Sequence, residues 1–484
     1  MQLKEMMDYL GIKTNVDIEI GGIQYDSRKI KKGDFFVALS GYATDGHQYI
    51  QNAVSNGAVA VLSEKEANTT VPVFICNNTR KAIAKLAYFW YGFPDCKMRL
   101  IGVTGTNGKT TITHLIKWVL EQENNKTGLI GTINNQIGDK ELPASNTTPE
   151  PLALAEIMAQ MQEDGCKTVV MEVSSHALKQ DRALGCHFDG AIFTNLTQDH
   201  LDFHHTFEDY LVSKIKLFTE LGKGNTAGRY GVINVDDPAA GAFIEACSVP
   251  IWTYGIEKEA TLQAVEYFLT PFGSKFSLLY QGQITKVQVP LTGKFNVYNA
   301  LAAISALLAE GLELPVILQH LTKVPQVAGR FQKIEEGQPY MVIIDYAHTP
   351  DGLENVLRTA RDLAGSAQLI TVFGCGGDRD KAKRPIMGVI SGRLSDYTIV
   401  TSDNPRTENP LEIIGHIQQG ISSITDKYTM KPDRRCAIAA ALKMAQPGDV
   451  VIIAGKGHEN YQIVGKEILH FDDAEIAREI LRQG

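Results

Sequence analysis

Residues 99–120 read RLIGVTGTNGKTTITHLIKWVL, and this stretch decides the fold of the middle of the chain. The apolar run over residues 99–104 predicts a buried strand, and the glycines in residues 105–108 predict a turn. From Ile112 on, apolar residues recur three and four positions apart, which is typical of a helix that begins at Lys109. A strand, a glycine turn, Lys-Thr and a helix are together typical of a phosphate-binding loop.

The chemistry of this loop suits the phosphates of a nucleotide. Glycines let backbone N–H groups face an anion, and the N-terminus of the helix adds a partial positive charge. Lys109 would reach the terminal phosphates, and the hydroxyl of Thr110 would face Mg²⁺. Val103 stands where the strict P-loop pattern has glycine, so the loop alone predicts a nucleotide phosphate and nothing finer. The expected phosphate-binding residues are Gly105, Thr106, Asn107, Gly108, Lys109, Thr110 and Thr111.

The composition limits the kind of protein. A length of 484 residues suggests three domains at about 150 residues each, and 44% apolar residues suffice for several cores. The net charge of −8 argues against a nucleic-acid-binding protein. The seven cysteines include no CxxC pair, which implies neither a zinc site nor a disulfide framework. The N-terminus lacks the apolar segment of a signal peptide, and no apolar run approaches the ~18 residues of a membrane span, so we expect a cytoplasmic protein.

The pattern of strands and helices predicts an α/β fold with three domains. Residues 1–97 are expected to form a small N-terminal α/β domain, and residues 98–332 a central P-loop-type ATPase domain with a mostly parallel sheet. Residues 333–484 alternate strands and helices, which predicts a Rossmann-like, doubly wound domain. The expected elements of the first domain are strands near 34–39, 58–62 and 71–75 and helices near 47–56 and 79–90. The expected strands of the last domain are 340–345, 369–373, 397–401 and 450–454.

The central domain carries acidic and histidine residues close to strand ends. Glu172 lies near the end of the apolar strand over residues 168–173, where a carboxylate is costly unless it is paired or binds a metal. Oxygen ligands without a nearby cysteine favour Mg²⁺ over zinc. We expect His200 to be a metal ligand because it directly ends a strand-and-turn segment, whereas His204 and His205 are interpreted as capped or solvated. The possible ligands of this segment are Asp199, His200, Asp202, His204 and His205.

Two helix starts in the central domain have capping signals. Pro149 suits the first turn of a helix, with one of the two preceding threonines as its cap. Thr206 and Asp209 form a variant of a capping box, which predicts a helix over residues 206–220.

Polar residues follow each of the four strands expected in the last domain. Ligands of doubly wound sheets collect at the carboxyl ends of the strands. Four polar sets on one edge of one sheet therefore predict a binding face rather than four unrelated loops. The sets occupy residues 345–348, 374–379, 402–406 and 455–459.

These motifs resemble those of the Mur ligases, the ATP-dependent amide-forming enzymes of peptidoglycan precursor synthesis, over essentially the whole chain. The segment Asp403-Asn-Pro-Arg406 is similar to the signature of the branch that uses meso-diaminopimelate rather than L-lysine. His205 departs from the family pattern, because glycine is common at this position. The stretches that match are Thr104–Thr111, Asn146–Pro149, Glu172–His176, Asp199–Asp202, Asn296–Asn299 and Asp345–His348.

The resemblance implies a reaction in two steps. The γ-phosphate of ATP would go to the D-Glu side-chain carboxylate of UDP-MurNAc-L-Ala-D-Glu, and the amine of diaminopimelate would then displace phosphate from the acyl phosphate. Such an enzyme uses ATP and Mg²⁺ and serves cell wall biogenesis, and with it cell shape, cell division and the cell cycle. We expect a monomer with small-molecule substrates and no nucleic acid. The alternatives are an L-lysine-adding ligase, a folylpolyglutamate synthetase and a nucleotide-switched binding protein.

The resemblance also implies roles for single residues. The catalytic residues would be Lys109, Glu172, His200 and Lys214. The metal would be held by Thr110, Glu172, His200 and a carbamylated Lys214, since carbamylation turns a cation into a metal ligand. Outside the phosphate loop, ATP would contact Asn299, Arg330, Asp345 and His348. The UDP-linked substrate would contact Ser27, Thr147, Thr148, Ser174, Gln180 and Arg182. Diaminopimelate would contact Arg379, Asp403, Asn404, Pro405, Arg406, Gly455 and Glu459.

Arg406 is expected to choose between the two amino acids. A guanidinium can grip the distal carboxylate of diaminopimelate through two parallel hydrogen bonds. L-Lysine has no carboxylate at that position, so Arg406 would be left unpaired.

Overall fold

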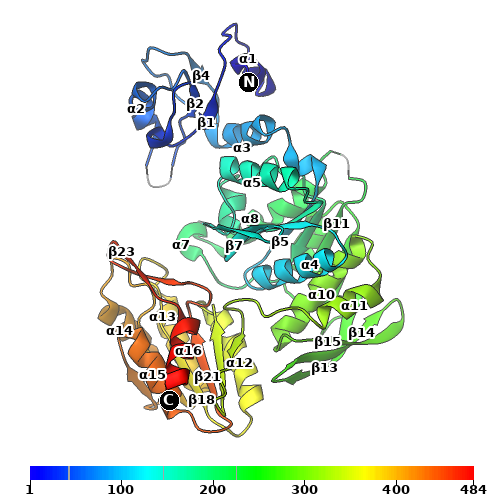
Figure 1. The fold of residues 1–484 in the computed structure, drawn as a ribbon, viewed down its shortest axis with the longest axis vertical. Coiled ribbons are helices and arrows are strands. Elements are labelled where there is room, and N and C mark those ends of the chain that lie inside the picture. Colours follow the sequence, from blue (N-terminus) through cyan, green and yellow to red (C-terminus); the bar gives the residue numbers. More distant parts are fainter. Residues whose placement is uncertain (42–43, 145, 225, 484) are drawn as a thin grey trace. The chain divides into compact units, whose positions relative to one another are not determined.

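The computed structural model describes residues 1–41, 44–144, 146–224 and 226–483. It comprises two compact units, whose elements are labelled in Figure 1. Strands β5 (Arg99–Thr104) and β10 (Gly190–Phe193) and helix α8 (Phe207–Leu221) each run from one unit into the other. The first unit consists of Met1–Gly102, Asn124–Ala191 and Thr219–Arg229. The second consists of Val103–Glu123, Ile192–Phe218 and the chain from Tyr230 onward.

The first unit begins with a four-stranded parallel sheet in the order β1-β2-β3-β4. The expected strands and the helix over residues 79–90 are confirmed, the helix because Asn78 caps it by accepting a hydrogen bond from Lys81 N (2.9 Å). The strands are β1 (Gly22–Gln24), β2 (Asp34–Val37), β3 (Ala60–Ser63) and β4 (Val73–Ile75). The helices are α1 (Leu3–Tyr9), α2 (Ile50–Ser55) and α3 (Thr79–Trp90), with 3₁₀ turns at Ser27–Lys29, Gly46–Tyr49 and Pro94–Lys97.

The rest of the first unit carries strand β9, which ends at Glu172 and pairs in parallel with β6. Strands β7 and β8 extend β6 in antiparallel fashion. Helix α5 starts at Pro151 and not at Pro149, so the predicted cap is wrong: Thr148 Oγ1 instead donates to the carbonyl of Glu172 (2.8 Å). The elements are β6 (Thr127–Ile130), β7 (Asn134–Ile137), β8 (Lys140–Pro143), α5 (Pro151–Glu163), β9 (Thr168–Glu172) and α6 (Ser175–Lys179).

The second unit places helix α4 (Lys109–Gln122) directly after the glycine turn, as predicted. The capping signal at Thr206 is also confirmed, because Asp209 N donates to its hydroxyl (3.1 Å). Strands β13 to β15 form an antiparallel meander that the sequence pattern did not predict. The strands here are β11 (Tyr230–Asn234), β12 (Ile251–Gly255), β13 (Leu262–Thr270), β14 (Gly273–Tyr280) and β15 (Gln283–Val289). The helices are α7 (Leu201–His204), α8 (Phe207–Leu221), α9 (Ala240–Ala246), α10 (Lys294–Ala309) and α11 (Leu314–Leu321).

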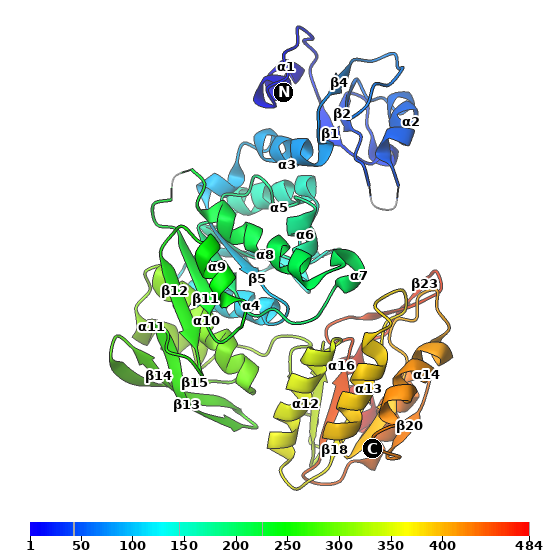
Figure 2. The ribbon, with the colours of Figure 1, turned by 180° about the vertical axis from the view of Figure 1, so that it is seen from behind.

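The C-terminal part of the second unit is the predicted doubly wound sheet. Its six strands have the order β16-β17-β21-β18-β19-β20, and all pairs are parallel except β16 with β17. Figures 1 and 2 show α15 and α16 on one face and α12, α13 and α14 on the other. The strands are β16 (Gln332–Ile334), β17 (Met341–Asp345), β18 (Leu369–Phe373), β19 (Tyr397–Val400), β20 (Tyr428–Met430) and β21 (Val450–Ala454). The remaining elements are α12 (Pro350–Ala364), α13 (Lys383–Leu394), α14 (Pro410–Ile421), α15 (Arg434–Met444), β22 (Tyr461–Val464), β23 (Glu467–His470) and α16 (Asp473–Gln483).

This sheet is buried on both faces because its strands are continuously apolar. Ile343 packs into the core under α12 to α14, whereas its neighbours Val342 and Ile344 pack into the core under α15 and α16. Over the described part of the chain, no helix is both long and apolar enough to cross a membrane. All seven cysteines are free.

Candidate active site

The glycine turn after β5 tolerates no other residues at two positions. Gly105 and Gly108 have φ angles of +147° and +89°, which side-chain-bearing residues rarely adopt. A Cβ atom at Gly105 would lie 1.8 Å from Thr194 Oγ1, and one at Gly108 would lie 2.5 Å from Asn299 Oδ1. The two glycines therefore set the shape of the loop and bring Asn299 of α10 beside it.

Two lysines converge on this loop. Lys109 Nζ donates to the carbonyls of Gly105 (3.0 Å) and Thr106 (2.8 Å), and Lys214 Nζ of α8 donates to the same Gly105 carbonyl (2.8 Å). Lys214 is almost fully buried. Burial and the ammonium of Lys109 hold the pKa of Lys214 well below its ordinary value. The loop therefore gathers positive charge where phosphate is expected, beside a buried amine that favours its neutral form.

Asp199 and His200 lie side by side on the loop that leads into helix α7. His200 Nε2 lies 3.2 Å from Asp199 Oδ2, and His200 has a left-handed φ of +56°. Burial raises the pKa of Asp199, but the positive charges of His200, His348 and Lys383 outweigh that effect and hold it below its ordinary value. An ionised carboxylate and an imidazole suit a divalent cation.

The two histidines interpreted as capped or solvated differ from each other. His205 is exposed, with a left-handed φ of +61° that explains why glycine suits this position. His204 is buried, so it is not solvated: its ring centroid lies 4.9 Å from that of Phe203 and 5.1 Å from that of Tyr210.

Arg330 joins the phosphate loop to the residues after β17. Its guanidinium donates to Thr110 Oγ1 (2.9 Å) and lies over the ring of Tyr346 at 4.6 Å. Asp345 is buried and accepts hydrogen bonds from the backbone N–H groups of Phe331 (2.6 Å) and Ala347 (2.7 Å). The ring of His348 also lies close to the ring of Tyr346, with 4.6 Å between the two ring centroids. The residues predicted for ATP thus lie around Tyr346 and the loop.

The first unit brings together four of the residues predicted for the UDP-linked substrate. Thr148 accepts a hydrogen bond from Ser174 N (3.0 Å), and Arg182 donates to the Thr148 carbonyl (3.2 Å). Thr147 shares a hydrogen bond with Thr132 (3.0 Å). Gln180 is the C-terminal cap of α6, and Ser27 lies apart on a 3₁₀ turn held by Asn56.

Glu172 belongs to the same unit and is fully buried. Its carboxylate accepts hydrogen bonds from the backbone N–H and the hydroxyl of Thr132, both at 2.9 Å. Sequence reasoning missed Thr132, whose only local signal is its place at the end of an apolar strand.

Three loops meet at the carboxyl edge of the C-terminal sheet, and they carry the residues predicted for diaminopimelate. A Cβ atom at Gly377 would lie 1.9 Å from the Pro405 carbonyl, and one at Gly455 would lie 2.8 Å from Asp403 Oδ2. Asn404 Nδ2 donates to Glu459 Oε2 (2.8 Å). The glycines thus allow loops 374–379, 402–406 and 455–459 to approach within contact distance.

Arg406 is held at this edge in a strained backbone conformation, with φ +51°. Its N–H donates to the carbonyl of Ile463 (3.0 Å), and its guanidinium NH1 donates to the carbonyl of Gly377 (2.8 Å). Arg379 is exposed, and burial and Glu459 raise the pKa of Tyr461 although the guanidiniums of Arg406 and Arg379 oppose that rise. The edge therefore presents two guanidiniums beside the carboxylates of Asp403 and Glu459.

A different group of possible metal ligands lies in the first unit among the described residues: Asp95, Cys96 and His187. His187 Nδ1 is hydrogen-bonded to Asp95 Oδ2 (2.8 Å), which raises the pKa of His187 and favours a protonated ring. Burial and the Asp95 charge raise the pKa of the Cys96 thiol. These shifts favour an ion pair beside a neutral thiol over a metal site.

Comparison with known proteins decides the family. The Mur ligase middle domain matches residues 103–307, the Mur ligase glutamate ligase domain residues 329–457, and the Mur ligase family catalytic domain residues 19–89. A relative from Syntrophomonas wolfei, named UDP-N-acetylmuramoyl-L-alanyl-D-glutamate--2,6-diaminopimelate ligase, is 46% identical over 100% of this chain and 99% of its own. The chain belongs to the Mur ligase family. The resemblance seen in the sequence motifs is thus confirmed.

Solved structures agree with membership of the Mur ligases. A structure titled as the same diaminopimelate ligase is 33% identical, with a TM-score of 0.70, and covers 100% of this chain and 99% of its own. A MurF ligase from Thermotoga maritima, solved in complex with ADP, is 18% identical with a TM-score of 0.65 over 95% of this chain and 97% of its own; it shows the shared fold. The α/β fold with three Mur ligase domains is therefore confirmed, and the chain is a ligase.

Proposed function

We propose that this Mur ligase adds meso-diaminopimelate to the D-Glu side-chain carboxylate of UDP-MurNAc-L-Ala-D-Glu, with conversion of ATP to ADP and phosphate. The observation that carries the proposal is the cluster of Asn404, Arg406 and Glu459 at the carboxyl edge of the C-terminal sheet. Carboxylates there suit the ammonium group of an amino acid, and guanidiniums suit its carboxylates. Full-length relatives with this activity in their names support the same choice.

The first step of the proposed reaction makes an acyl phosphate. A carboxylate oxygen of D-Glu attacks the γ-phosphorus, and the bond from that phosphorus to the β–γ bridging oxygen breaks, which releases ADP. Lys109 lies 3.0 Å from the Gly105 carbonyl and is within reach of a phosphate bound in the turn, where it would neutralise the developing charge. Asn299, Arg330, Asp345 and His348 would hold the rest of the nucleotide.

The second step makes the amide. The neutral amine of diaminopimelate attacks the acyl carbon, the C–N bond forms, the C–O bond to phosphate breaks, and the amine loses a proton. Arg406 would hold the distal carboxylate, because the guanidinium N–H groups other than the one bound to Gly377 have no partner among the described residues. Arg379, Asp403, Asn404, Pro405, Gly455 and Glu459 complete the proposed amino-acid site.

Mg²⁺ fits the chemistry of several residues in the proposed set. The hydroxyl of Thr110, the carboxylate of Glu172 and the imidazole of His200 are suitable donors. Lys214 fits as a carbamate, since burial and a lowered pKa favour the neutral amine, which is the form that reacts with CO₂. The bound ion would neutralise charge on the transferring phosphoryl group.

We propose three domains with the boundaries 1–97, 98–332 and 333–484. The UDP-linked substrate would bind to the first of these domains through Ser27. It would also contact a group of residues in the central domain, namely Thr147, Thr148, Ser174, Gln180 and Arg182. The protein would be a cytoplasmic monomer.

A coupled phosphate-release assay with ATP, Mg²⁺ and UDP-MurNAc-L-Ala-D-Glu tests the proposal. We expect turnover with meso-diaminopimelate, none with L-lysine, and a product mass that corresponds to one added diaminopimelate. Turnover mainly with L-lysine would keep the ligase and overturn the role of Arg406. ATP hydrolysis without an amide product would favour a nucleotide-switched binding protein, and turnover independent of the UDP-linked substrate would favour a folylpolyglutamate synthetase.

A further inference from the structure

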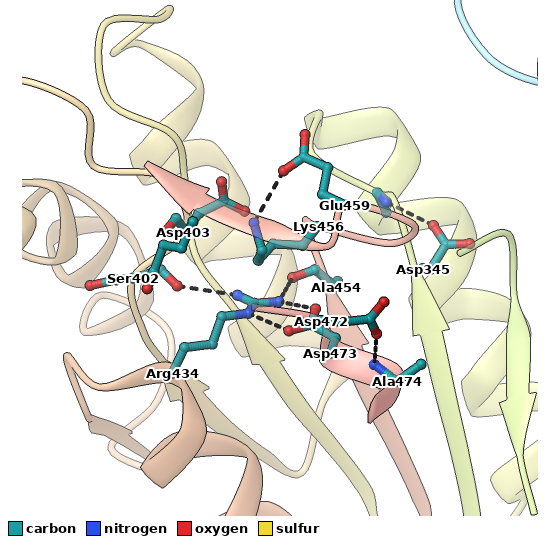
Figure 3. A network of polar contacts seen from close by, with 12 residues as sticks. Asp345, Ser402, Asp403, Arg434, Ala454, Lys456, Glu459, Asp472, Asp473 and Ala474 are labelled. Carbon is teal, nitrogen blue, oxygen red and sulfur yellow. Dashed lines mark hydrogen bonds and ion pairs between the residues drawn. The ribbon is translucent and has the colours of Figure 1, made fainter. Parts of the chain in front are cut away.

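Lys456 is a fully buried cation that the proposed reaction does not use. It lies between Gly455 and Gly457, directly after β21. Its ammonium donates to Glu459 Oε2 (3.1 Å), to Asn404 Oδ1 (3.3 Å) and to the carbonyl of Tyr461. Figure 3 shows the ammonium pointing at Glu459 from the same loop. All three N–H bonds of the ammonium therefore have an acceptor.

These contacts fix two residues of the proposed amino-acid site. Asn404 Oδ1 accepts from Lys456 and from Ile463 N (2.9 Å), so its amide nitrogen must face Glu459. That nitrogen donates to Glu459 Oε2 (2.8 Å). The same carboxylate oxygen is thus held from two sides.

The charged groups around Glu459 show why a nearby cation is needed to keep its carboxylate ionised. Burial and the carboxylate of Asp403 raise the pKa of Glu459, and Lys456 opposes them. Tyr346 and Tyr461 face Glu459 as neutral phenols, since burial raises the pKa of both.

Arg434 is the other buried cation near this carboxylate. Its guanidinium is paired with Asp473, which is also fully buried, at 2.6 Å. It also donates to the carbonyls of Ser402 (3.3 Å), just after β19, and Ala454 (3.0 Å), at the end of β21, and Figure 3 shows both carbonyls beside the guanidinium. Because Asp473 balances Arg434, the charge of Lys456 is left to balance Glu459.

We propose that Lys456 is a positioning residue for the incoming amino acid: its ammonium keeps Glu459 ionised and in place and fixes the orientation of the Asn404 amide. The inference rests on the proposed function and deepens it. Lys456 is covered on all sides, so it acts through Glu459 and Asn404 without contact with substrate.

The test compares the unaltered chain with Lys456→Met, Lys456→Gln and Lys456→Arg in the full assay. Met keeps the apolar stem and Gln keeps hydrogen-bond donors, but both remove the charge. We expect both to raise KM for diaminopimelate by roughly 10- to 100-fold, as for the loss of one hydrogen bond to a charged group, with kcat and KM for ATP within a few-fold. We also expect KM for diaminopimelate to recover as pH rises, because Glu459 then ionises without the cation. Lys456→Arg should keep the pH profile of the unaltered chain.

The control is Lys466→Met, which removes an exposed lysine in the turn between β22 and β23 and should leave all parameters unchanged. Folded Met and Gln variants with an unaltered KM and pH profile would overturn the inference. If neither variant folds, the ionisation state of Glu459 in the unaltered chain can be measured by ¹³C NMR of glutamate-labelled protein. An ionised Glu459 at neutral pH supports the role of Lys456, and a protonated Glu459 overturns it. Failure of the proposed function is distinct, since the unaltered chain would then make no amide.

Discussion

Among single residues, Arg406 carries the proposed choice of amino acid. We predict that Arg406→Gln lowers kcat/KM with meso-diaminopimelate by about 100-fold, because a two-pronged hydrogen bond to a carboxylate is lost. The ratio of turnover with diaminopimelate to turnover with L-lysine should shrink by the same factor. Steady-state kinetics with each amino acid measures both effects.

Arg393 supplies the matched control for this change. It is an exposed arginine on α13, so Arg393→Gln should behave as the unaltered chain. A diaminopimelate preference that survives Arg406→Gln would assign the choice to another residue, with Arg379 the first to examine.

Lys214 makes a prediction about modification. Its burial and lowered pKa favour the neutral amine, so we predict that it binds CO₂ as a carbamate. Protein in ¹³C-bicarbonate should show a carbamate resonance that Lys214→Ala loses and Lys216→Ala keeps. Because a metal ligand is lost, Lys214→Ala should also need roughly 10- to 100-fold more Mg²⁺ for half-maximal activity. An unchanged Mg²⁺ requirement would show that the side chain of Lys214 does not bind the metal.

The buried carboxyl group of Asp345 leads to a prediction about how the stability of the protein depends on pH. Burial raises its pKa to about 6, against the lowering effects of Arg330 and two backbone N–H groups. The folded chain therefore holds this proton more tightly than the unfolded chain, and the contribution of Asp345 to the free energy of unfolding falls as pH rises from about 4 to about 6. We predict that Asp345→Asn removes this part of the slope of the urea midpoint against pH. The exposed Asp362 is the control: Asp362→Asn should keep the slope.

The sequence could suggest these residues but not the buried charges beneath them. Lys109 and Arg406 lie in local motifs, so their types and spacing are informative without a structure. Arg434 and Asp473 are 39 positions apart and meet only because α15 and α16 cover the same face of one sheet. Lys456 likewise depends on acceptors from its own loop, from loop 402–406 and from the start of β22. Tertiary packing determines which partner a buried charged residue contacts, and local sequence patterns carry no information about that packing.

Whole helices and strands also differ in whether local sequence patterns or tertiary contacts determine them. Helices α3 and α4 were predictable because a cap or a glycine turn coincides with a clear apolar period. The start of α5 was not, since two prolines suit a first turn and tertiary hydrogen bonds of Thr148 decide between them. The meander β13 to β15 has many exposed positions on its strands, so its alternation is weak.

The packing of α13 on α14 yields a prediction at this scale. A Cβ atom at Gly420 of α14 would lie 1.9 Å from the Pro385 carbonyl, so the two helices meet backbone to backbone. We predict that Gly420→Ala lowers the free energy of unfolding by about 1–3 kcal/mol, as overpacking does. Gly415 lies on the same helix, where a Cβ atom would meet nothing within 4 Å, and Gly415→Ala should stabilise the protein by up to about 1 kcal/mol. Urea unfolding of both variants measures the difference, and equal effects of the two would refute the packing argument.

For the whole molecule, the proposed reaction imposes a geometric demand. The acyl phosphate must receive an amine that the residues of the C-terminal sheet hold, while the phosphate loop and the UDP-substrate residues belong to other parts of the chain. An acyl phosphate that meets water is hydrolysed, so the amine must arrive with water excluded. Ligases of several domains meet this demand by closure.

We therefore predict that residues 333–484 move relative to the rest of the chain when ATP and UDP-MurNAc-L-Ala-D-Glu bind together. Small-angle scattering should show a smaller radius of gyration with both ligands than with neither. Lys109→Ala provides the control, since a chain that cannot hold the terminal phosphates should stay at the unliganded value. Because ADP lacks the γ-phosphate that Lys109 would hold, ADP with the UDP-linked substrate should give a smaller change than ATP. An identical profile in all four states would count against closure, and the three substrates would then have to meet in a site already formed in the free protein.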